Sequence, residues 1–100
     1  MRIILHLDAP KLLQFVRQVQ QPQSSVFILT CNTLHGTSPF KFFWTKNGRP
    51  LDKSTNLRID IQDSFSLLTI KNISLADTGN FSCSVQNQHG IDSQWSILEV

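Results

Sequence analysis

The sequence contains no tyrosine, only two cysteines and no cluster of like charges among its 100 residues. Charged residues make up 16% of the chain, below the roughly 25% of an average soluble domain, so long disordered stretches are not expected. The net charge is only +2, and the lysines and arginines are scattered. A nucleic-acid-binding protein would instead present a basic stripe. We therefore expect no nucleic-acid partner.

Long apolar runs are also missing. No stretch approaches the roughly 20 apolar residues of a membrane-spanning helix, so a membrane anchor is expected only outside this fragment. The apolar start of the chain is interrupted at His6 and stopped at Asp8, which is too short for the core of a signal peptide, about 7–15 residues. Residues 1–9 are expected to be an end segment, a truncation or a first strand.

The residues needed for catalysis do not come together in the sequence. His6, His35 and His89 are far apart, and there is no Gly-x-Ser-x-Gly elbow, carboxylate pair or glycine-rich phosphate loop. We expect no enzyme activity, no metal, no cofactor and no small-molecule substrate.

The two cysteines, Cys31 and Cys83, lie 52 residues apart. They could be buried thiols, a redox pair or a disulfide. Their spacing is not that of a CxxC motif, and two cysteines without nearby histidines cannot complete a four-ligand zinc site. A long-range disulfide is favoured, which implies an oxidising compartment.

What is abundant is short-range alternation of apolar and polar residues, the pattern of half-buried strands. The seven Phe and two Trp can fill one core, so we expect a single domain over 1–100 with its core at about 10–100. Asn47-Gly48 is a strong hairpin-turn dipeptide. Seven or eight short strands at this spacing predict an all-β sandwich of two sheets. The expected strands cover residues 12–19, 26–32, 41–46, 57–61, 66–70, 81–85 and the segment from 91 to 100.

Several residues then fall in a recognisable order. Two cysteines on facing strands would bridge the sheets, and an indole would pack on the bridge. Leu68, Ile70 and Phe81 are expected beside it in the core. A turn with aspartate and glycine leads into the second cysteine strand. The residues in order are Cys31, Trp44, Leu68, Ile70, Asp77, Gly79, Phe81 and Cys83.

This constellation resembles the immunoglobulin superfamily, intermediate (I) set, over roughly residues 10–100. The resemblance implies a Greek-key sandwich with one intersheet disulfide. Phe81 departs from the pattern, because the family has tyrosine two residues before the second cysteine. One side-chain hydrogen bond, worth about 1 kcal/mol, is then lost. We also expect Arg58 to form a salt bridge with Asp77.

A finer resemblance lies in segments 36–40, 43–51, 66–70 and 79–87, which are similar to Dscam-type adhesion receptors, most strongly to variable immunoglobulin domains of arthropod Dscam and its shortened relatives. It implies an ectodomain on the extracellular side of the plasma membrane that binds an identical copy as an antiparallel homodimer. A heterophilic receptor or immune domain, and a structural spacer, are the alternatives.

Two faces are candidates for the interface. The resemblance favours one sheet, with Arg58 and Asp60 able to pair across a two-fold axis. On the other sheet, outward aromatics could either bind a partner or be covered by the amino-terminal segment or a neighbouring domain. The favoured face comprises Val26, Ile28, Arg58, Asp60, Leu67 and Thr69, and the alternative face comprises Phe43, Trp95 and Ile97.

Two Asn-x-Ser triplets are acceptors for N-glycosylation in a secreted protein, at Asn72 and Asn80. Asn80 alternates with the inward Phe81, so it should face solvent. A glycan on Asn80 would block the sheet face around it.

Overall fold

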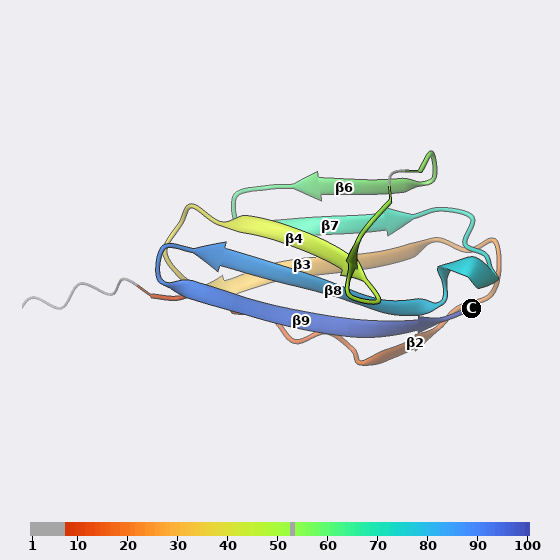
Figure 1. Cartoon of the computed structure of the whole chain (residues 1–100), viewed down its shortest axis with the longest axis horizontal. Helices are drawn as coiled ribbons and strands as arrows, with labels where there is room; N and C mark the ends of the chain where they lie inside the picture. The colour runs from red at the N-terminus through yellow and green to blue at the C-terminus, as the bar shows by residue number, and fades with distance from the viewer. Residues whose placement is uncertain (1–7, 53) are drawn as a thin grey trace, which may run out of the picture.

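The computed structural model describes residues 8–52 and 54–100, and shows two β-sheets packed face to face (Figure 1). One sheet has four strands in the order β1-β3-β7-β6, and the other has five in the order β2-β9-β8-β4-β5. The predicted all-β sandwich is confirmed. The expectation for residues 1–9 lies outside the described part of the chain as far as residue 7, and residues 8 and 9 belong to no strand. The elements are β1 Lys11–Leu12, β2 Gln18–Gln20, β3 Phe27–His35, β4 Lys41–Lys46, β5 Arg49–Pro50, β6 Leu57–Ile61, β7 Phe65–Ile70, the 3-10 turn η1 Leu75–Asp77, β8 Gly79–Asn87 and β9 Gly90–Glu99.

The core follows from alternation, since every second side chain of a strand points to the same face. Cys31 on β3 and Cys83 on β8 are fully buried and form the disulfide that joins the two sheets. This confirms the pairing favoured by the sequence. The expected core residues Trp44, Leu68, Ile70 and Phe81 are all buried around it.

Trp44 occupies the centre of the sandwich. Its ring stacks on Phe15, with the centroids 6.3 Å apart. Its indole N–H donates to the hydroxyl of Ser66 at 2.8 Å, and this hydroxyl donates in turn to the carbonyl of Asp60 at 3.0 Å. Ser66 is fully buried, so the hydrogen bond satisfies an indole group that would otherwise lose its water without replacement.

The segment expected as one strand or a strand pair over 12–19 divides between the two sheets. β1 pairs with β3, whereas β2 runs parallel to β9. Two side chains of β9 bind the segment in which the chain passes from one sheet to the other. Asp92 accepts from the backbone N–H of Leu12 at 2.8 Å, and Gln94 accepts from that of Phe15 at 3.3 Å. Polar side chains therefore replace a backbone ladder where the chain changes sheets.

The hairpin turn at Asn47-Gly48 forms between β4 and β5 as predicted. Both residues have positive φ, 52° and 78°, as the type I′ turn requires. The helical content of the described residues is the single turn η1, and none of their helices could cross a bilayer.

Candidate protein-recognition faces

The outer face of the four-stranded sheet carries the favoured candidate residues in neighbouring rows. Strand register places Ile28 beside Thr69, and Thr69 beside Arg58. The next row joins Leu67 to Asp60. Ile28 is 56% exposed and Val26 47% exposed, so the sheet presents apolar side chains to solvent. Exposed apolar patches of this kind are typical of protein contacts.

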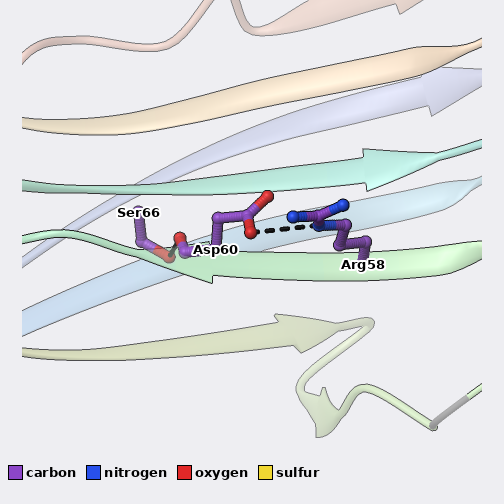
Figure 2. Close-up of polar contacts among 3 residues, drawn as sticks. All are labelled: Arg58, Asp60 and Ser66. Atoms are coloured by element: carbon purple, nitrogen blue, oxygen red, sulfur yellow. Dashed lines mark hydrogen bonds and ion pairs between the residues drawn. The ribbon is translucent and has the colours of Figure 1, made fainter.

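One ion pair lies on this face. The Nε of Arg58 is 3.0 Å from Oδ1 of Asp60, two residues along the same strand (Figure 2). The Arg58 side chain is largely solvent-exposed, so the pair adds little stability in water. Both side chains remain available to a partner.

The expected salt bridge between Arg58 and Asp77 is wrong. Leu57 points into a pocket that Asp77 also lines, whereas Arg58, the next residue, points to the opposite face of the strand. The Asp77 carboxylate instead accepts from the backbone N–H of Ser74 at 2.8 Å, in a capping box that holds η1. The expected orientation was therefore wrong by one residue along the strand: Leu57, and not Arg58, faces the side on which Asp77 lies.

The pocket itself has a volume of about 540 Å³ and lies beside the turn at residues 47–52. Two of its charged groups are already bonded within the protein, since Lys46 donates to the carbonyl of Ala76 at 2.6 Å and Asp77 caps η1. Residues 8–52 and 54–100 hold no cluster of His, Cys, Asp and Glu that could bind a metal ion. His35 and His89 are both exposed, at the end of β3 and in the turn before β9.

The outer face of the five-stranded sheet carries the alternative candidates. Phe43 and Trp95 are half-exposed, and Ile97 is partly buried. Ile91, which was not anticipated, adds a further exposed side chain at 62%. Serine and threonine hydroxyls bond to one another between these apolar residues, in the pairs Thr45–Ser82 and Ser84–Ser93.

Part of this second face is covered by the amino-terminal segment. The guanidinium of Arg17 lies 4.5 Å from the centroid of the Trp95 ring, and its Nη1 donates to the Trp95 carbonyl at 3.1 Å. A cation over an indole face is a favourable contact. Trp95 is therefore already in contact with its own chain.

The two glycosylation triplets lie at different places. Asn72 is exposed in the turn after β7, with a φ of +52°. Asn80 is exposed on β8 and lies opposite Ile97 on β9. A glycan on Asn80 would therefore cover the outer face of the five-stranded sheet and leave the other sheet open.

The free edge of the four-stranded sheet was not anticipated as a site. Ile59 and Ile61 belong to the inward phase of β6, because they pair with the buried Leu68 and Ser66 of β7. They are nevertheless 38% and 60% exposed. β6 is an edge strand of its sheet (Figure 1), and these two inward-phase side chains are not covered by the rest of the sandwich.

Comparison with known proteins places this architecture. The model of the immunoglobulin I-set domain family matches residues 10–100. The cell adhesion molecule DSCAM of Rattus norvegicus is 32% identical over 77 residues, which cover 74% of this chain but 4% of the relative. The muscle M-line assembly protein unc-89 of Caenorhabditis elegans is 30% identical over 89 residues, covering 88% of this chain and 1% of the relative.

A solved structure agrees in fold. The Dscam1 Ig7 domain, isoform 5, superposes with a TM-score of 0.79 at 23% identity, covering 92% of this chain and 96% of that one. The chain thus spans a small fraction of its curated relatives and nearly the whole of this single solved domain.

Proposed function

The chain belongs to the immunoglobulin I-set family, and on that basis we propose that it is an extracellular adhesion or recognition module that binds a second copy of itself. The observation that carries the proposal is the outer face of the four-stranded sheet, which presents exposed Ile28 and Val26 on one side of β7 and the Arg58–Asp60 pair on the other. We propose no catalytic role, in keeping with a family of structural and binding modules.

Two observations support an extracellular location on a cell-surface protein. The Cys31–Cys83 disulfide suits an oxidising compartment, because cytosolic thiols are normally kept reduced. The relatives include a cell adhesion molecule. The similarity to a muscle assembly protein favours a structural spacer as the second candidate.

The choice of face depends on what each face already contacts. Arg17 lies over Trp95 on the five-stranded sheet, and the glycosylation acceptor Asn80 lies on that same face. A glycan there would hinder protein contact. The four-stranded sheet has neither feature among its outward residues Ile28, Leu67 and Thr69, so it is the better candidate for recognition.

Pairing of identical faces about a two-fold axis brings each residue near its own counterpart or a near neighbour. Apolar side chains tolerate this arrangement, whereas a face with one sign of charge would repel itself. Arg58 and Asp60 supply one charge of each sign. An antiparallel face-to-face homodimer is therefore compatible with the chemistry of this sheet.

The test compares two matched substitutions by sedimentation velocity. Ile28→Glu places a charge on the proposed face, and Ile91→Glu places the same charge on the other sheet at a similarly exposed isoleucine. We expect Ile28→Glu to weaken self-association at least tenfold and Ile91→Glu to leave it unchanged. A strictly monomeric parent protein at high concentration, or the opposite order of effects, would refute the proposal.

A cell experiment separates self-recognition from the alternatives. Cells that display the domain should aggregate as a single population if binding is homophilic. A heterophilic receptor domain would require a second population carrying its ligand. If the domain is a structural spacer, neither the single population nor the mixed populations should aggregate.

A further inference from the structure

The four edge strands of the two sheets differ in length and protection. β1 and β5 have two residues each and β2 has three, and β5 contains Pro50, which has no N–H to offer. β6 has five residues and, within residues 8–52 and 54–100, pairs only with β7. An exposed edge of this length can pair with another strand.

The hydrogen bonds that flank β6 show which of its backbone groups face outward. The Lys71 N–H donates to the carbonyl of Asn56, and the Gln62 N–H donates to that of Phe65. Antiparallel ladders alternate between bonded and non-bonded pairs. Even-numbered residues of β6 therefore bond toward β7, and the N–H and carbonyl groups of Ile59 and Ile61 point to the open edge.

We propose that β6 is a second self-association site, at which the edges of two copies pair antiparallel and centred on Ile59. In this register Ile59 pairs with Ile59 of the second copy through two backbone bonds. Each Ile61 N–H also donates to the Leu57 carbonyl of the other copy. The two four-stranded sheets become one continuous sheet.

Charge selects this register over its neighbours. Centring on Ile59 places Arg58 of each copy opposite Asp60 of the other, in the non-hydrogen-bonded pairs where side chains approach most closely. A shift to centre on Arg58 would place two arginines opposite each other, and a shift to Asp60 would place two aspartates opposite each other. Sliding one copy of β6 by a single residue would place outward-pointing backbone groups of one strand opposite groups of the other that already bond toward β7, so the two strands could not pair.

The apolar side chains agree with the same register. Leu57, Ile59 and Ile61 share the inward phase of β6, and the last two remain 38% and 60% exposed. Edge pairing would place the three from one copy against the three from the other, where they extend the apolar layer of each sandwich. Burial of this exposed surface favours association.

This site differs from the outer face described above, so the two can be tested separately. In the Ile28→Glu background the proposed face is disabled, and any remaining two-fold association reports the edge. Arg58→Asp leaves two negative charges on β6, and Asp60→Arg leaves two positive charges. Each should self-associate at least tenfold more weakly than the Ile28→Glu parent.

Mixing the two charge variants gives the decisive result. The register places opposite charges across both contacts of the mixed pair, so the mixture should form a heterodimer with at least the parent's affinity in native mass spectrometry. A mixture no tighter than either variant alone would overturn the proposal. So would a monomeric Ile28→Glu parent at millimolar concentration.

Amide hydrogen exchange reads the backbone contact directly and does not depend on any variant of β6. Association should slow exchange at Ile59 and Ile61 at least tenfold, while Arg58, already bonded toward β7, should change little. Self-association without protection at Ile59 and Ile61 would show that a different surface is used, and would leave the proposed outer face intact.

Discussion

Replacing Ser66 by alanine removes one hydroxyl from the centre of the sandwich and tests whether a buried hydrogen bond holds Trp44. The hydroxyl accepts from the indole N–H at 2.8 Å and is fully buried. Without it the N–H keeps no partner and no water. Leaving a buried donor unsatisfied costs about 1–3 kcal/mol.

Ser96 offers a matched control, because it is also fully buried but its hydroxyl has no hydrogen-bond partner among residues 8–52 and 54–100. Ser96→Ala deletes the same atom without orphaning another group. Its free energy of unfolding should stay unchanged or rise by up to about 1 kcal/mol, since an unpaired polar atom leaves the core. The two substitutions are chemically identical, but only Ser66→Ala should lower the free energy of unfolding.

Urea denaturation of the three proteins measures the difference, with similar m values as the sign that the same surface unfolds. For a domain of this size, each kcal/mol corresponds to a shift of about 4–8 °C in Tm. Trp44→Phe, made in the parent protein and in the Ser66→Ala protein, completes the test. Removing the indole N–H should abolish most of the cost of Ser66→Ala. Equal losses for Ser66→Ala and Ser96→Ala would refute the reasoning.

Three further predictions concern the links between elements. Replacing Cys31 and Cys83 together by alanine should lower the free energy of unfolding by about 4 kcal/mol, because the closed loop spans 52 residues, and a mass difference of two hydrogens on reduction of the parent would verify the bond. Asp92→Ala should speed amide exchange at Leu12 about tenfold, whereas Asp92→Asn, which keeps an acceptor oxygen, should speed it less. Gly48→Ala should cost about 1 kcal/mol in thermal unfolding through backbone strain alone, because φ is +78° and, apart from the two chain neighbours, no described residue lies within 4 Å of the added methyl group; an unchanged Tm would contradict this.

The alternating strands were predictable because their pattern is local. Phe27, Leu29 and Cys31 reveal their buried face by spacing alone, and Asn47-Gly48 marks a turn that few other residues can form. The outward positions of Phe43 and Trp95 followed from the same count along the strand.

What could not be predicted depends on contacts distant in sequence. Asp92 and Gln94 occupy inward positions of β9, where a binary pattern expects apolar residues, and only the crossing of the amino-terminal segment explains them. The Arg58–Asp77 expectation failed because proximity at one end of the sandwich says nothing about the phase of the strand. The alternation over 57–61 predicted the strand but not that Ile59 and Ile61 on its inward phase would remain exposed.

These departures have a common physical basis at the edges of the sheets. At the amino-terminal side, Asp92 and Gln94 accept from backbone N–H groups of the chain where it changes sheets, and Arg17 donates to the Trp95 carbonyl, so these polar atoms and the Trp95 ring are already in contact with the chain itself. At β6 two side chains of the inward apolar phase, Ile59 and Ile61, remain exposed, and the charges of Arg58 and Asp60 on the other phase sum to zero. A strand whose two charges are opposite and two residues apart repels a copy in every symmetric register centred on a charge and attracts it in the one centred between them. The same spacing that makes Arg58–Asp60 a weak ion pair within one chain therefore makes it a selective contact between two.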